Sequence, residues 1–446
     1  MKVKFISSVL VSLFLLALML LSFGTFQNAS AQQQQRISFK GKYGVQLPYK
    51  LIEESSIPLN TLKLKLSNRT ANSAGYVKMV VPKYVYPDGR TPEEGVIFYD
   101  INGNIINSKM FEKKNIKPSS ADKEIEMIPT HIEHVSNYGK YFITETNIKF
   151  SSPVDEGITK YEIFDDTGTK KWEEEVTSIY DEGGPDYFIS DYDGSFVKNK
   201  EGTITFYDPQ GKVIKEVTYS PFELYYAAFS DDGNYFAMNS VNPRYLQKTE
   251  PKARFHLFDK QGEELWRYET EHQRMSEIFI SPNGEYVLGS VYDMVYDTID
   301  RERNEANSVT YIFRNDGSIV REYENMIINH DQVFISPEGK HAAIWARGDN
   351  GGILLVNLET GDILYSLNNG YRAADVLSEK NLVVFASLIR IVVLKLDGTP
   401  VFMQNYRADL LGYENTWYGA KVRFSEDGEE IFVLARKNVF RYRLQK

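Results

Sequence analysis

A tyrosine-aspartate pair occurs twice in the segment SVYDMVYDTIDRERNEANS, which runs from Ser290 to Ser308. The pairs are Tyr292-Asp293 and Tyr296-Asp297. A tyrosine ring offers flat apolar area with a polar end, and Tyr, Trp and Arg are enriched where proteins bind partners. Long, irregular segments on a rigid scaffold are also where binding residues concentrate. This segment is therefore the first candidate for a ligand-binding surface, and the alternative is that its rings only pack the segment onto the scaffold.

A second aromatic segment, MQNYRADLLGYENTWYG, begins at Met403. It contributes Tyr406, Arg407 and Trp417 to the candidate surface. A third segment, YENMIINHDQ, contributes His330, a residue type that changes its charge near neutral pH. These residues complete the set of candidate ligand contacts.

Three stretches have metal-ligand residue types without the spacing of a known site. THIEH places His131 and His134 three residues apart, which on a regular strand puts their side chains on opposite faces. The acidic stretches SDYDGS, from Ser190 to Ser195, and VYDMVYDTIDRE lack the spacing of an EF-hand calcium loop. We therefore predict no metal site and no cofactor, and calcium at the acidic stretches is the alternative.

No nucleophile motif or phosphate-binding motif marks the chain as an enzyme. The sequence contains no Cys, which excludes thiolate catalysis and thiolate metal sites. It contains no Gly-x-Ser-x-Gly elbow and no glycine-rich phosphate loop. His272 and the neighbours His330 and Asp331 are the candidate acid-base groups of an enzyme with its site in a central funnel. That enzyme is the alternative to a binding protein.

The scaffold that must position these residues is built from a repeat. FSDDGNYFAMNS, beginning at Phe229, returns as FISPNGEYVLGS at Phe279 and as FSEDGEEIFVLA at Phe424. In each copy a glycine turn joins two apolar stretches, because glycine accepts a positive φ without steric cost. A second pattern, such as RFHLFDKQGEELWRYE, adds two more strands and another tight turn. One unit is thus a four-stranded antiparallel meander.

The number and spacing of the units predict the fold class. The first tight turn recurs at seven positions from Gly139 to Gly428, with a degraded copy around Lys380, and the second turn also recurs seven times. A mean spacing of about 48 residues predicts an all-β chain that forms a β-propeller of four-stranded antiparallel blades. We predict seven blades, or eight if residues 41–90 complete a separate first blade. The C-terminal strands should pair with the N-terminal strands in YVKMVVP and GVIFYDINGNII and so close the ring.

The units FSxDGxYxAxxS and LFDxxGxxLW resemble the WD40-like, YVTN-like and quinoprotein-like propeller repeats of exported bacterial proteins. The resemblance covers about Tyr76 to Lys446. Quinoprotein blades carry a Gly-x-x-x-Trp signature, which appears here from Gly168 to Trp172 and from Gly262 to Trp266. A quinone cofactor and a quinone-dependent oxidoreductase are what this signature would imply.

The N-terminus predicts export from the cytoplasm. Lys2 and Lys4 precede an apolar run from Ile6 to Phe26, and a small-x-small cleavage pattern, Ala-Ser-Ala, ends at Ala31. We expect a secreted or periplasmic protein. It would contact a membrane only if the apolar segment stayed uncleaved as an anchor.

We predict three regions: a signal peptide over residues 1–31, a linker with a strand segment over 32–75, and the propeller over 76–446. The net charge of −10 disfavours a nucleic-acid partner, because such proteins usually carry a basic surface. The tight turns should lie on one face of the ring and the long connections on the other, which we call the long-loop face. We expect that face to bind a protein, peptide or glycan. A structural envelope protein without a discrete ligand is a further alternative.

Overall fold

The computed structural model describes residues 36–37, 50–58, 63–66, 77–81, 94–99, 105–111, 114–116, 125–127, 130–136, 139–149, 156–178, 185–219, 222–242, 253–296, 303–348, 352–367, 371–387, 390–405, 421–425, 427–435 and 438–445. All regular elements in these ranges are β-strands. Within the same ranges, no helix has the length and apolar character needed to cross a membrane. The predicted signal peptide lies outside the described residues.

Eight groups of four antiparallel strands make up the fold, and we number them as blades. Blade 1 is β3 (Lys63–Leu66), β4 (Val77–Val81), β5 (Glu94–Tyr99) and β6 (Ile105–Phe111). Blade 2 is β9 (Thr130–Val135), β10 (Tyr141–Lys149), β11 (Gly157–Asp165) and β12 (Lys170–Ser178). Blade 3 is β13 (Asp186–Ile189), β14 (Phe196–Lys200), β15 (Thr203–Tyr207) and β16 (Val213–Thr218). Blade 4 is β17 (Glu223–Phe229), β18 (Tyr235–Val241), β19 (Ala253–Asp259) and β20 (Glu264–Thr270).

The second half repeats the same order. Blade 5 is β21 (Arg274–Ile280), β22 (Tyr286–Tyr296), β23 (Arg303–Arg314) and β24 (Ile319–Glu324). Blade 6 is β25 (Met326–Ile335), β26 (His341–Gly348), β27 (Gly352–Asn357) and β28 (Asp362–Leu367). Blade 7 is β29 (Tyr371–Leu377), β30 (Leu382–Ser387), β31 (Arg390–Leu394) and β32 (Pro400–Asn405). Blade 8 joins β33 (Lys421–Phe424), β34 (Glu430–Ala435) and β35 (Asn438–Gln445) to β2 (Lys50–Pro58). The sheet of blade 6 has a fifth strand, β1 (Arg36–Ile37), next to β28. The small pair of β7 (Lys114–Ile116) and β8 (Ile125–Met127) forms a separate sheet.

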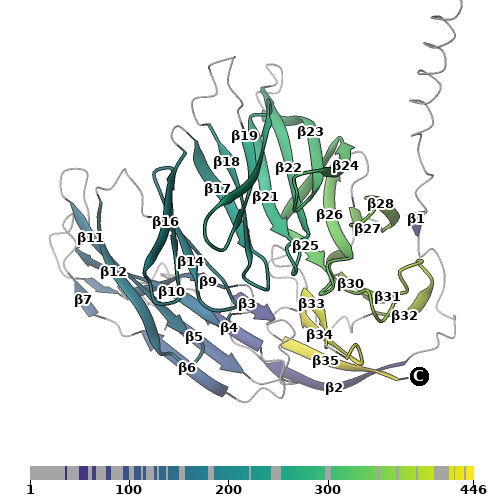
Figure 1. The fold of residues 1–446 in the computed structure, drawn as a ribbon. Coiled ribbons are helices and arrows are strands. Elements are labelled where there is room, and N and C mark those ends of the chain that lie inside the picture. The colour runs from purple at the N-terminus through teal and green to yellow at the C-terminus, as the bar shows by residue number, and fades with distance from the viewer. Residues whose placement is uncertain are drawn as a thin grey trace, which may run out of the picture. The chain divides into compact units, whose positions relative to one another are not determined.

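The strand that completes the last blade comes from nearer the N-terminus than the sequence suggests. β2 pairs with β35 over residues 50–58, and Figure 1 shows this purple strand beside the yellow C-terminal strand. The segments expected to do this, YVKMVVP and GVIFYDINGNII, instead supply β4, β5 and β6 of a separate first blade. The described residues therefore form eight blades, the alternative to the favoured seven; seven are four-stranded sheets and blade 6 has a fifth strand. β3 of blade 1 also contacts β33 of blade 8.

The first strand of each blade lies at the inner edge. From β9 to β33, each first strand contacts the first strand of the next blade. Tight turns join the first strand to the second and the third to the fourth, as the repeat predicts. Twelve turn glycines have a positive φ, for example Gly211 at 77° and Gly284 at 72°. The degraded copy around Lys380 keeps this geometry, because Asn381 has a φ of 55° and asparagine tolerates that conformation better than most residues.

Asn381 offers a test of this turn. The Leu396 amide donates a hydrogen bond of 3.1 Å to Asn381 Oδ1. Asn381→Ala removes that acceptor and places a poorly tolerated side chain at positive φ, so it should lower the free energy of unfolding by about 1–2 kcal/mol. Asn381→Gly removes the acceptor alone and should cost about half as much. Equal losses in urea unfolding of the two variants would show that the backbone conformation contributes nothing.

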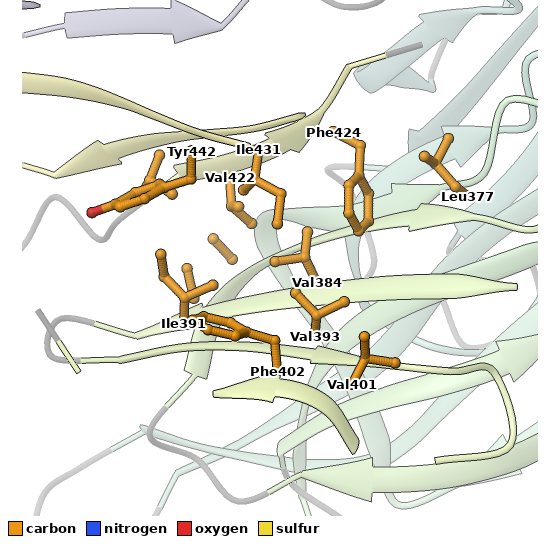
Figure 2. Packing of buried hydrophobic residues seen from close by; sticks show 13 residues of the cluster. Leu377, Val384, Ile391, Val393, Val401, Phe402, Val422, Phe424, Ile431 and Tyr442 are labelled. Carbon is orange, nitrogen blue, oxygen red and sulfur yellow. The ribbon is translucent and has the colours of Figure 1, made fainter. Parts of the chain in front are cut away.

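The hydrophobic core is divided into layers between neighbouring blades. Figure 2 shows one layer, in which Val384 and Val393 of blade 7 pack with Val422, Phe424 and Ile431 of blade 8. All five side chains are at most 2% exposed. Alternate residues of each strand face the two neighbouring blades, so both faces of a blade are buried. Polar side chains with freedom to bind a ligand are thereby confined to strand ends, connections and outer edges.

Candidate functional site

The longest candidate loop is mostly a β-ribbon. β22 extends to Tyr296 and β23 begins at Arg303, and the two strands pair from Asp293 opposite Ala306 to Tyr296 opposite Arg303. The expectation of an irregular loop from Ser290 to Ser308 is therefore wrong over most of its length. Strand pairing holds Tyr292 and Asp293 more firmly than a loop would, which suits a binding surface that must be pre-formed.

Tyr292 meets two side chains that the sequence did not associate with it. Arg274, the first residue of the inner strand β21, lies opposite Tyr292 in the strand register. Its guanidinium Nη1 donates a 3.2 Å hydrogen bond to the hydroxyl of Tyr225, which lies on the inner strand β17 of the preceding blade. Tyr225 is 43% exposed, so its ring is available to a partner.

The group continues into the next blade. Arg347 at the end of β26 donates a 3.0 Å hydrogen bond to Glu305 of β23. Burial, followed by the negative charge of Glu305, raises the pKa of Tyr292, while Arg274 and Arg347 lower it. We call the set made by these five residues the Tyr292 cluster: Tyr225, Arg274, Tyr292, Glu305 and Arg347. It presents two aromatic hydroxyls, two guanidinium groups and one carboxylate from three consecutive blades.

Asp293 is held by its neighbours. Its carboxylate accepts a 3.1 Å hydrogen bond from the Gln273 amide and a 3.2 Å hydrogen bond from Asn307 Nδ2. His272 Nδ1 lies 3.5 Å from Asp293 Oδ2. Asp293 thus ties the connection before β21 to the β22–β23 ribbon. This fixes the position of Arg274, two residues after His272.

The structure gives less information on the other predicted ligand contacts. Tyr296 ends β22, and His330 lies within β25 rather than in a loop, between the stretches that pair with β26. The pairing passes from Ile328 to Val333, so His330 and Asp331 stand outside this ladder. Asp297, Tyr406, Arg407 and Trp417 lie outside the described residues. The structure therefore joins only Tyr292 and Asp293 of the candidate set to a described site.

The THIEH segment departs from the regular strand that the sequence analysis assumed. His134 pairs with Ile143 and His131 with Glu145, on either side of a register shift, so both histidines lie on one face of β9. Partial burial and the carboxylates of Glu145 and Asp186 raise the pKa of Glu133 beside them. Among the described residues no group of three or more His, Asp or Glu could hold a metal ion. Of the acids in SDYDGS, Asp193 accepts the Ser195 amide within the blade turn, and Asp191 accepts the Ser136 hydroxyl and the Lys140 amide of blade 2.

Two buried side chains, Ser240 and His256, and the partly exposed Glu264 form a hydrogen-bonded chain across blade 4. Ser240 Oγ lies 2.9 Å from His256 Nε2, and His256 Nδ1 lies 2.7 Å from Glu264 Oε1. Since a carboxylate can only accept, His256 donates from Nδ1 and accepts the Ser240 hydroxyl at Nε2. The order matches a serine-hydrolase triad, but Ser240 and His256 are at most 1% exposed, so no substrate could reach them. The chain is structural.

The two tryptophans of the quinoprotein-like signature pack between blades. The Trp172 ring lies so close to Gly211 of blade 3 that a Cβ there would come within 2.0 Å of Cδ1. Trp266 occupies the same place against Gly317 of blade 5. This inter-blade contact accounts for both tryptophans without a cofactor.

Comparison with known proteins supports the fold alone. No protein-family model matches the sequence, and no curated protein is a detectable relative. Among solved structures, the chain is similar to one described as the structure of the Dos1 propeller, with a TM-score of 0.52 and 14% identity over 89% of this chain and 95% of that chain. Together with the seven four-stranded sheets and the five-stranded sheet of blade 6, this similarity shows that the chain is a β-propeller.

Proposed function

We propose that the protein is an exported binding module that holds a protein, peptide or glycan partner on its long-loop face, at the Tyr292 cluster. The observation that carries this proposal is the convergence of Tyr225, Arg274 and Arg347 on Tyr292 from three blades. Tyrosine and arginine together are the residue types on which binding energy concentrates. The propeller fold supports a binding or scaffold role in general, and the N-terminal segment supports export.

Paired truncations test the proposed face. The double variant Arg274→Ala with Tyr292→Ala removes one guanidinium and one ring from the cluster. Its matched control, Tyr192→Ala with Arg314→Ala, removes the same two groups from the tight-turn side of the blades, where Tyr192 is 63% exposed. Capture of partners from the native envelope fraction by the cluster variant should fall at least tenfold, while the control should capture as the unmodified protein does. The opposite pattern would place the binding surface on the tight-turn face.

A further inference from the structure

A cleft of about 540 Å³ lies along the outer edge of the fold, between β16 of blade 3 and β20 of blade 4. Its size falls within the range of small-molecule sites, roughly 300–1,000 Å³. It is separate from the Tyr292 cluster, and no residue is shared between them. Its charged lining consists of three basic and three acidic side chains: Lys215, Arg254, Arg267, Glu216, Glu263 and Glu264.

The charges in this cleft balance, and most are already paired. Lys215 is bonded to Glu263, and Arg267 Nη2 donates a 2.7 Å hydrogen bond to Glu264. A charged ligand of either sign would meet three carboxylates and three basic groups. Neither sign of ligand charge therefore gains net Coulomb energy from the lining.

Buried residues beneath the cleft hold two of its polar groups, Glu264 and Arg254, in fixed positions. Burial opposes ionisation of Glu264, but hydrogen bonds from His256 and Arg267 prevail and lower its pKa to about 2. Its carboxylate is thus a fixed acceptor at any physiological pH. Arg254 lies over the Phe222 ring at 3.5 Å from its centroid, with a side chain only 17% exposed. Arg254 Nε lies 2.9 Å from Glu269 Oε1, and this ion pair also holds the guanidinium in place.

We propose that this cleft binds a neutral polyhydroxylated ligand, that is, a sugar. A sugar hydroxyl can donate to a carboxylate and accept from a guanidinium at the same time, without upsetting the charge balance. Glu264 and Arg267, joined by a 2.7 Å hydrogen bond, present an acceptor and a donor side by side to adjacent hydroxyls. Because His256 bonds to Glu264 and the Phe222 ring lies under Arg254, little ordering of these groups is required on binding.

Saturation-transfer difference NMR on the purified protein tests this proposal. The probes are glucose, galactose, N-acetylglucosamine, maltose and cellobiose, with glucuronate and glucosamine as charged counterparts. At least one neutral sugar should give signals that fall threefold or more in Arg267→Gln and in Lys215→Ala. The matched control is Arg443→Gln, which removes a similar arginine-glutamate pair: Arg443 Nη2 lies 2.7 Å from Glu430, and its side chain is 44% exposed, against 38% for Arg267.

The outcomes separate the proposal from its rivals. No signal from any neutral sugar, or stronger binding of glucuronate or glucosamine than of glucose, would overturn it. Signals that persist in both cleft variants would place the sugar elsewhere, and an equal loss of signal in Arg443→Gln would also overturn the assignment of the sugar to this cleft. If Arg267→Gln fails to fold, Lys215→Ala still tests the cleft, because Lys215 makes no contact with the buried His256 chain. The result is independent of the Tyr292 cluster.

Discussion

Gly211→Ala should lower the free energy of unfolding by about 3 kcal/mol or more. Gly211 has a φ of 77°, a conformation that costs an alanine roughly 1–2 kcal/mol. The new Cβ would also overlap the Trp172 ring at 2.0 Å from Cδ1, and relieving such overpacking typically costs a further ~1–3 kcal/mol. Denaturant unfolding followed by circular dichroism measures the loss.

The matched control for this change is Gly428→Ala. Gly428 has a similar φ of 73°, but its nearest neighbour would be the flexible Leu377 side chain at 3.0 Å. This variant should show the conformational cost with little of the overlap, a loss of about 1–2 kcal/mol. Equal losses in the two variants would mean that the contact between the tight turn and the preceding blade does not constrain the ring.

His256→Leu should lower the free energy of unfolding by about 3 kcal/mol, because it leaves the buried Ser240 hydroxyl without its partner and removes a charge-assisted hydrogen bond to Glu264. The half-buried His341 lies 2.8 Å from the Ser378 hydroxyl through Nδ1 and bonds to no carboxylate there, so His341→Leu should cost clearly less. A larger loss in His341→Leu would contradict the structural role assigned to the blade 4 chain.

The same histidine makes stability depend on pH in a defined direction. Burial lowers the pKa of His256 below 6.5, although Glu264 acts to raise it and Arg267 and Arg254 lower it further. Below about pH 6.5 the unfolded state therefore binds a proton that the folded state does not, and stability falls as the pH falls. The contribution is fully present above pH 6.5 and declines by at most about 1.4 kcal/mol per pH unit below it. The stability difference between the unmodified protein and His256→Leu, measured from pH 8 to pH 5, should shrink.

The tight turns could be predicted from the sequence because each turn depends only on the residue at its own position of positive φ. A positive φ selects glycine, or asparagine at Asn381, whatever the rest of the chain does. The closing strand could not be read in the same way. Pairing of β2 with β35 joins residues nearly four hundred positions apart, and no local pattern selects β2 over β4 or β5. For the same reason eight blades could not be chosen over seven.

The sequence could predict which residue types form the candidate site, but not which side chains surround Tyr292. The sequence singled out Tyr292 because it lies in a long connecting segment and tyrosine is enriched where proteins bind partners. Tyr225, Arg274 and Arg347 lie in ordinary strand patterns, and only the stacking of three blades brings them to Tyr292. The strand pairing of residues 293–296 with 303–306 was missed because the segment is rich in Asp, Glu and Asn, which are uncommon in strands. The Ser240–His256–Glu264 chain likewise crosses three strands.

The most direct test of the long-loop face is photo-crosslinking in the native cells. p-Benzoylphenylalanine is placed at Tyr225, in the Tyr292 cluster, or at Tyr192, on the tight-turn side; the two side chains are 43% and 63% exposed. After irradiation, the proposal predicts a discrete adduct from position 225 that disappears in the Arg274→Ala, Tyr292→Ala background, and none from position 192. An adduct from position 192 alone would contradict the assignment of the binding face.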